Sequence, residues 1–232
     1  MKFIIKFLNN NFINKLFNKI VNAKFSKIFI PIFRKHYKIN TDEILQPQKF
    51  NTLNDYFTRD IDLSKRPMGN AKYISPCDGV VTAAGKISEQ KFFNVKGKLV
   101  DVNTLLGKCE DVKSFAVIYL SPHNYHQFHA IDDNNAIDIY KIGLKSIPVN
   151  NLGFKMGNPF LENYRIIMET DKYFYIAVGA TNVNSIELSK TNFKKGERIG
   201  EFRFGSTIVL LFKDDVNNIK LGKIKVRESL CD

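Results

Sequence analysis

Cysteine is scarce in this chain of 232 residues, in which only Cys77, Cys109 and Cys231 occur. Three cysteines cannot all pair, and their spacing matches no metal-ligand pattern, which argues against a disulfide framework and for a reducing compartment. The chain also lacks the roughly 18 uninterrupted apolar residues of a membrane-spanning helix. Its start lacks the apolar region and cleavage site of a secretory signal. We therefore expect neither a spanning helix nor a removed signal, and a location on the cytosolic side.

Acidic residues are absent from residues 1–38, although the whole chain contains 23 of them. The same segment holds nine of the 35 Lys and Arg residues, so it carries most of the net charge of +12. From Phe12 to Phe33 apolar residues recur at helical spacing, with lysines between them and an interruption at Pro31. Basic amphipathic helices of this kind bind anionic membrane surfaces. We expect residues 1–40 to form a membrane-associating helical segment.

Two other interpretations of this segment remain open. One is an ordinary helix that packs on its own domain, and the other is a nucleic-acid-binding arm. The high content of Phe and Ile argues against nucleic acid, because such an arm needs basic and polar contacts to phosphates.

The remaining residues, 41–232, are expected to form one domain, since the chain is long enough for one good core but hardly for two. Residues 40–67 are polar and predicted to be extended. Short apolar, β-branched segments separated by Gly, Asn and Pro then predict strands. These are residues 80–83, 115–119, 137–142, 165–168, 174–178, 186–188 and 207–212. The expected fold class is α+β, with a β-rich barrel-like or sandwich core preceded by N-terminal amphipathic helices.

Gly205 and Ser206 stand immediately before the most apolar of these segments, which runs from Ile208 to Phe212. Glycine tolerates strained backbone angles, so the hydroxyl of Ser206 could fold back onto the carbonyl that precedes it. By itself a Gly-Ser-Thr step before a strand is usually only a turn.

Histidines are few and clustered: three of the four are His123, His126 and His129. A metal site is one interpretation of the cluster. It is disfavoured, because no acidic or thiolate partner is nearby and the three rings need not converge on a strand followed by a turn. Histidines that simply pack are the other interpretation, above all for His123.

Three stretches together resemble phosphatidylserine decarboxylase: residues 75–79 (Ser-Pro-Cys-Asp-Gly), residues 120–129 (Leu-Ser-Pro-His-Asn-Tyr-His-Gln-Phe-His) and the Gly205-Ser206-Thr207 step. Shorter echoes are residues 57–59 (Phe-Thr-Arg), 66–67 (Arg-Pro), 96–97, 105–107 and 178–186. They follow one another in unbroken order from about Phe50 to Phe212, which makes the resemblance to the bacterial type of this family specific.

The resemblance implies that Asp78, His129 and Ser206 form a charge relay. Such a set suits the chemistry, because a serine hydroxyl becomes a good nucleophile only when an imidazole takes its proton and a carboxylate orients that imidazole. By itself, Asp78 before Gly79 would also fit an ordinary turn. His126 is the candidate donor of the proton that replaces carbon dioxide, since imidazole titrates near neutral pH.

The resemblance further implies autocatalytic cleavage between Gly205 and Ser206, into a large chain of residues 1–205 and a small chain of residues 206–232. Ser206 becomes a covalent pyruvoyl group, the only cofactor expected, and no metal is expected. This group forms a Schiff base with the amine of phosphatidylserine and accepts the electrons released when CO2 leaves. Phosphatidylethanolamine is the expected product.

Expected partners are phosphatidylserine, an anionic membrane surface and the two associated chains of the same proenzyme, but no nucleic acid; a homodimer is left open. The expected location is peripheral, on the cytoplasmic side of the cell membrane. Departures from the family pattern at Asn124, Gln127 and Tyr164 leave the relay complete but affect expected headgroup contacts. Two rival hypotheses are a serine hydrolase that keeps the Ser206 hydroxyl, and a non-catalytic lipid-binding relative, which should lack a relay residue.

Overall fold

The computed structural model describes residues 11–46, 49–180, 186–203 and 206–232. Its helices are α2 (Asn11–Asn22), η1 (Lys24–Phe29), α3 (Ile30–Tyr37), α4 (Leu53–Phe57), η2 (Leu63–Lys65), α5 (Val102–Leu106), α6 (Asn151–Met156) and α7 (Pro159–Glu162). Its strands are β1 (Gly79–Lys86), β2 (Phe92–Val95), β3 (Lys98–Asp101), β4 (Ser114–Leu120), β5 (Gln127–His129), β6 (Asn134–Asn135), β7 (Asp138–Ile142), β8 (Arg165–Glu169), β9 (Tyr173–Gly179), β10 (Ile186–Leu188), β11 (Asn192–Phe193), β12 (Arg198–Phe202), β13 (Ser206–Phe212) and β14 (Gly222–Ile224).

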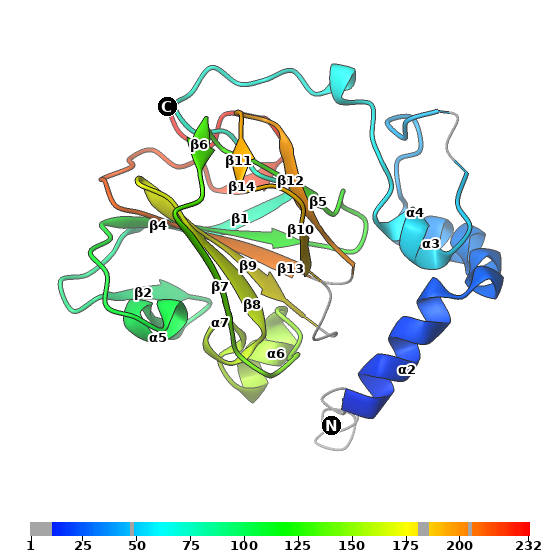
Figure 1. The fold of residues 1–232 in the computed structure, drawn as a ribbon, viewed down its shortest axis with the longest axis horizontal. Coiled ribbons are helices and arrows are strands. Elements are labelled where there is room, and N and C mark those ends of the chain that lie inside the picture. The colour runs from blue at the N-terminus through cyan, green and yellow to red at the C-terminus, as the bar shows by residue number, and fades with distance from the viewer. Residues whose placement is uncertain (1–10, 47–48, 181–185, 204–205) are drawn as a thin grey trace.

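A seven-stranded antiparallel sheet, in the order β14-β1-β4-β13-β9-β8-β7, forms the centre of the molecule (Figure 1). β13 lies in the middle of it and pairs along its full length with β4 and β9. Its side chains alternate between two hydrophobic clusters, with Ile208 and Leu210 in one and Val209 and Leu211 in the other. A strand that is buried on both faces has no polar positions, which explains why this segment reads as a continuous apolar run.

The two faces of this sheet are covered by different elements. The small sheet β10-β12-β5 contributes Phe128, Ile199 and Phe202 to the cluster on one face. The β2–β3 hairpin and the helices α5, α6 and α7 supply the other cluster, which includes Leu105 and Phe160. The core is therefore an open, sandwich-like stack of layers. The α+β prediction is confirmed, and of its two architectures the sandwich is the one observed, since the described strands form no closed barrel.

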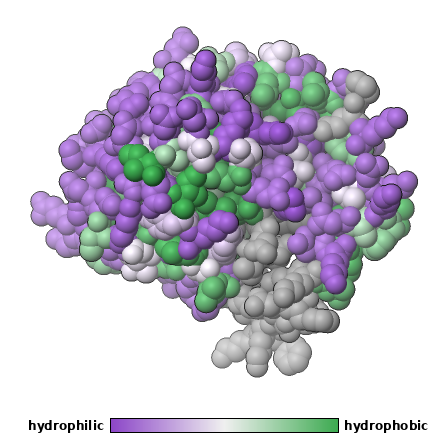
Figure 2. Space-filling model, in the orientation of Figure 1, coloured by the Kyte–Doolittle hydropathy of each residue, from purple (hydrophilic) through white to green (hydrophobic). Residues whose placement is uncertain are grey.

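The N-terminal helices pack against the segment around α4 through few contacts. Ser26 is buried and its Oγ accepts a hydrogen bond from the backbone N–H of Leu53. The ring of Phe33 lies 6.1 Å from that of Phe57, measured between centroids. Most of the large apolar residues on these helices remain exposed, namely Leu16, Phe17, Ile20, Phe25, Ile28, Phe29 and Ile32. Figure 2 shows hydrophobic surface on the side of the molecule where these helices lie, within a mostly hydrophilic exterior.

Within the described ranges, none of the helices combines the length and the apolar character needed to cross a membrane.

The prediction that residues 40–67 are extended is only partly right, because α4 interrupts them. Thr52 caps this short helix: its side chain accepts from the backbone N–H of Asp55, while the Asp55 side chain accepts from that of Thr52. The reciprocal capping box satisfies two otherwise free N–H groups and so favours a helix in a polar stretch. α4 matters for the site because it carries Phe57.

Candidate active site

One end of the large sheet brings together segments that are far apart in the sequence. Val80 of β1 is opposite Tyr119 of β4, and Leu120, the next residue of β4, is opposite Ser206 of β13. Ser206 is also opposite Gly179 of β9. Asp78, the loop after Leu120 and the start of β13 therefore meet at the same end of the sheet. A relay between them would require this.

Ser206 is completely buried at the first position of β13. By the alternation of side chains along a strand, it shares the face of Ile208, against which the small sheet packs. Among the described residues its Oγ has no hydrogen-bond partner. A buried hydroxyl without a partner is uncommon in folded proteins and is often found where a group is reserved for chemistry. Gly205, the predicted cleavage partner, lies outside the described residues.

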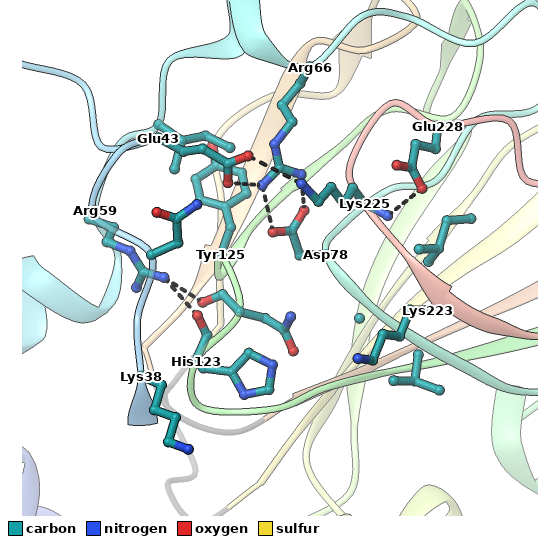
Figure 3. Close-up of a pocket in the computed structure, with 16 residues that line it drawn as sticks. Lys38, Glu43, Arg59, Arg66, Asp78, His123, Tyr125, Lys223, Lys225 and Glu228 are labelled. Atoms are coloured by element: carbon teal, nitrogen blue, oxygen red, sulfur yellow. Dashed lines mark hydrogen bonds and ion pairs between the residues drawn. The ribbon is translucent and has the colours of Figure 1, made fainter. Parts of the chain in front are cut away.

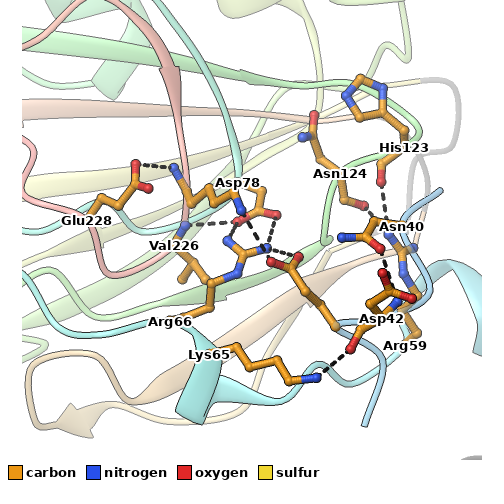
Figure 4. Close-up of polar contacts among 12 residues, drawn as sticks. Asn40, Asp42, Arg59, Lys65, Arg66, Asp78, His123, Asn124, Val226 and Glu228 are labelled. Atoms are coloured by element: carbon orange, nitrogen blue, oxygen red, sulfur yellow. Dashed lines mark hydrogen bonds and ion pairs between the residues drawn. The ribbon is translucent and has the colours of Figure 1, made fainter. Parts of the chain in front are cut away.

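Asp78 is held by an arginine rather than by a histidine (Figure 4). Arg66 donates from Nη1 to Oδ1 at 2.8 Å and from Nη2 to Oδ2 at 3.1 Å. The backbone N–H of Val226 donates to Oδ1 at 2.9 Å. Arg66 also pairs with Glu43, whose pKa is lowered by Arg66 and Lys225 against the effect of burial. Asp78 is thus a well-bound carboxylate that joins the start of the domain to its C-terminal segment.

His129 is buried in β5 and makes two polar contacts. Its Nδ1 lies 3.0 Å from the carbonyl oxygen of Gly196, and its Nε2 lies 3.1 Å from the hydroxyl of Tyr125. A carbonyl can only accept, so Nδ1 carries the proton and Nε2 is the acceptor in the neutral ring. Burial lowers the pKa of His129 to about 4; the charges of Arg227 and Arg198 act in the same direction and that of Asp78 in the opposite one.

His126 is also completely buried, and its Nδ1 lies 2.9 Å from the carbonyl oxygen of Asn124. The ring of Phe57 stacks on it with 3.9 Å between centroids. Its Nε2 has no hydrogen-bond partner among the described residues. Burial, together with the charges of Arg59 and His123, lowers the pKa of His126 to about 3. At neutral pH this ring is therefore a neutral proton acceptor.

The predicted relay residues lie in one region, but the described hydrogen bonds do not link them directly. Asp78 bonds to Arg66 and Val226, and His129 bonds to Gly196 and Tyr125. The relay assignment therefore stays a prediction. His123, by contrast, is exposed on the loop, so it is not the packed histidine that the sequence suggested.

Sequence reasoning missed several residues that hold the site. Arg59 and Arg66 lay within segments that echo the family, and Tyr125 lay within the histidine stretch, but no role was assigned to them. Arg227 carried no recognisable sequence signal. In the part of the chain that the structure describes, no three His, Cys, Asp or Glu side chains are grouped to hold a metal ion.

A pocket of about 500 Å³ opens beside Asp78 (Figure 3). Its walls come from the end of α3, the segment before β1, the histidine loop and β14. Lys38, Arg59, Arg66, Lys223 and Lys225 outnumber the acidic residues Glu43, Asp78 and Glu228 among its lining. The pocket is therefore suited to an anionic ligand.

Comparison with known proteins identifies the family of the chain. The family model for phosphatidylserine decarboxylase matches residues 53–230. A phosphatidylserine decarboxylase proenzyme from Bacillus mycoides is 36% identical over 230 residues, which cover 93% of this chain and 88% of that protein. A proenzyme of the same name from Bacillus cereus is 36% identical over 241 residues, covering 96% and 92% of the two chains. The chain belongs to the phosphatidylserine decarboxylase family, a family of carboxy-lyases.

Proposed function

We propose that this protein converts phosphatidylserine to phosphatidylethanolamine and CO2 by means of a pyruvoyl group formed from Ser206. The observation that carries the proposal is the position of Ser206: fully buried, at the sheet end shared with Asp78, with no partner for its Oγ in the part of the chain that the structure describes. The two relatives named above are proenzymes, which agrees with a chain that processes itself.

The proposed processing starts when the Oγ of Ser206 attacks the carbonyl carbon of Gly205 and the peptide bond is exchanged for an ester. His129 takes the hydroxyl proton at Nε2 and returns a proton to the freed amine of Ser206. Loss of the α-proton and rupture of the Cβ–Oγ bond then release residues 1–205 with a C-terminal carboxylate. The dehydroalanine left at position 206 takes up water, loses ammonia and becomes the pyruvoyl terminus.

The residues present fit such a group, because residue 206 begins a strand that stays paired on both sides after the cut. When formed, a pyruvoyl group supplies a carbonyl that withdraws electrons during decarboxylation. His126 lies in the same region and is proposed to return the proton. Its low pKa makes it a poor donor in the free site, but a bound anionic lipid would raise that pKa.

The pocket beside Asp78 is proposed to hold the phosphodiester of the lipid headgroup. Lys38 and Lys223 line it (Figure 3), and neither forms an ion pair within the described residues, unlike Arg66 and Lys225. Asp78 and Glu43, by contrast, are already paired with Arg66. Two lysines without a carboxylate partner leave positive charge for a phosphate.

The activity is tested with purified protein and vesicles that contain phosphatidylserine labelled in the serine carboxyl group. Labelled CO2 should be released, and none should come from vesicles of phosphatidylcholine alone. Cyanoborohydride added together with phosphatidylserine should couple the lipid to the small chain and stop turnover. Failure to release CO2 from a fully processed protein would overturn the proposed substrate.

We also propose that residues 1–40 attach the catalytic domain, residues 41–232, peripherally to the cytoplasmic face of an anionic membrane. Phe25, Ile28 and Ile32 are 55%, 62% and 66% exposed, although each would be stabilised by burial. An ordinary helix packed on its own domain would turn such residues inward. Lys24 and Lys27 lie among them and can contact anionic headgroups.

Replacing Phe25, Ile28 and Ile32 together by serine is expected to weaken binding to anionic vesicles at least about tenfold, a loss of about 1.4 kcal/mol. This loss is about 0.5 kcal/mol for each of the three side chains, which is less than the roughly 1.5–3 kcal/mol that full burial of one such side chain contributes. Sedimentation with vesicles at rising salt measures the effect. This triple variant is preferable to deletion of residues 1–33, because it keeps Phe33 on Phe57.

The matched control replaces Leu144 and Leu221 by serine, since both are exposed apolar residues outside the N-terminal helices. The control should bind vesicles like the unmodified chain. Equal pelleting of the triple variant and the control would place the membrane contact elsewhere.

A further inference from the structure

Arg59 is a buried cation without an acidic partner. It is 4% exposed and forms no ion pair with any described residue. Its Nη2 donates instead to the carbonyl oxygens of His123, at 2.9 Å, and Asn124, at 3.1 Å, as Figure 4 shows. Burial lowers the pKa of Arg59 although the more distant charges of Asp78 and Glu43 raise it, so the buried charge is costly. The Nη1 of Arg59 also lies 3.5 Å from the carbonyl oxygens of Tyr56 and Phe57, so the two shorter bonds, to the histidine loop, are the main contacts of the guanidinium.

One of these carbonyls also holds a histidine. The oxygen of Asn124 accepts from Arg59 and from Nδ1 of His126, which lies 2.9 Å away. Because both donors share one acceptor, the guanidinium fixes the position of the carbonyl that orients the ring. Phe57, on the helix just before Arg59, covers the face of the same ring.

The same arrangement recurs at His129. The carbonyl oxygen of Gly196 accepts from Nδ1 of His129 at 3.0 Å and from Arg227, whose Nε and Nη2 lie 3.3 and 3.2 Å away. Arg227 has a φ of 73°, a left-handed conformation that non-glycine residues adopt rarely. Its backbone N–H donates to Ser75, which fixes the turn from which the guanidinium reaches Gly196. Arg227 belongs to the segment that becomes the small chain in the proposed processing.

We propose that Arg59 and Arg227 are positioning residues, each of which fixes one histidine through a shared main-chain carbonyl and leaves that ring neutral with Nε2 as proton acceptor. The contacts do not depend on the proposed function. The inference rests on that function only for the proton transfers that the two histidines carry out. The arginine stands on the Nδ1 side in both cases, so its charge opposes a second proton on the ring without occupying Nε2.

The charges around each ring agree with this role. Arg59 and His123 are the charged or titratable groups that lower the pKa of His126. For His129 the corresponding groups are Arg227 and Arg198, with Asp78 acting in the opposite direction. Tyr125 also faces His129, and burial raises the pKa of its phenol, so it stays protonated and contributes no charge. Removing either arginine should therefore raise the pKa of its own histidine.

The test uses the full chain with Ser206→Ala, so that processing cannot alter the sample, and follows imidazole ¹⁵N signals through a pH titration. Arg59→Gln should raise the pKa of His126, and Arg227→Gly that of His129, each by about one pH unit or more. Arg227→Gly is chosen because glycine accepts the positive φ of this position. Arg59→Lys and Arg227→Lys keep the charge and should leave both titrations near their original values.

Arg165→Gln provides the matched control. Arg165 is also buried and also binds main-chain carbonyls, those of Leu105 and Thr104, but it does not contact the histidines. Its loss should lower the melting temperature without moving either histidine titration. Thermal melting of every variant confirms that it is folded before the titrations are compared.

A second measurement uses chains that retain Ser206. If His129 must be unprotonated to accept a proton, Arg227→Gly should shift the acidic limb of the cleavage rate to higher pH, while Arg227→Lys should not. Slower cleavage by the same factor at every pH, with unmoved histidine titrations, would overturn the proposal. Shifted titrations without any cleavage would support the role of the arginines and contradict only the proposed processing.

Discussion

The Ser206→Ala chain is expected to remain a single polypeptide of 232 residues without decarboxylase activity, whereas the unmodified chain should separate into residues 1–205 and 206–232. Alanine has no hydroxyl to attack the preceding carbonyl. Without that attack the chain is not cut, and residue 206 cannot become a pyruvoyl terminus. Intact mass and a denaturing gel measure the cut. Thr207→Ala is the matched control and should be processed normally, because Thr207 carries the neighbouring hydroxyl, which is also buried and has no partner among the residues described.

The two chains should separate only in denaturant. β13 is bonded on both sides, to β4 and β9, and β14 is bonded to β1. Val226 adds its bond to Asp78. The small chain should resist Edman sequencing until its keto terminus is reductively aminated. An active enzyme with an intact bond before Ser206 would contradict the pyruvoyl mechanism and favour a serine hydrolase.

The central strands could be predicted from the sequence because burial on both faces imposes its own pattern. β13, β9 and β4 are apolar almost throughout, so they were recognised with errors of one residue at most at either end. The β2–β3 hairpin was missed, since Phe92 and Asn94 face outward and weaken its pattern. The order of the strands could not be predicted, because it depends on pairing between segments such as β1 and β14 that lie far apart in the sequence.

The candidate site residues could be named from the sequence and their roles stay predictions, but their partners could not be foreseen. Ser206, Asp78, His126 and His129 lie in one region, yet each histidine is oriented by a main-chain carbonyl rather than by a carboxylate. Any residue can supply a carbonyl, so the sequence carries no sign of such a bond. Arg227 could not be predicted from the sequence either, because its contact with Gly196 depends on the conformation of a turn and not on a sequence motif.

Asp78→Asn and His129→Ala are each expected to slow self-cleavage by a factor on the order of 10³ or more, as the loss of a relay residue does in serine enzymes. A gel would show one band in place of two. For Asp78 this result has two explanations, since the carboxylate is also the main partner of Arg66. The loss leaves that buried arginine with Glu43 alone and costs about 1–3 kcal/mol, which by itself could distort the site.

Adding Arg66→Met to Asp78→Asn separates the two explanations. The double variant no longer holds a buried arginine that has lost one of its two carboxylates, and Glu43 keeps Lys225 as a partner, so it should regain much of the melting temperature that Asp78→Asn loses. If Asp78 acts on His129, the double variant stays uncut although it is stable. If Asp78 only neutralises Arg66, cleavage returns together with stability. We expect stability without cleavage, because the charge of Asp78 raises the pKa of His129 against burial, Arg227 and Arg198, and so stabilises the protonated ring that forms when His129 takes the proton of Ser206.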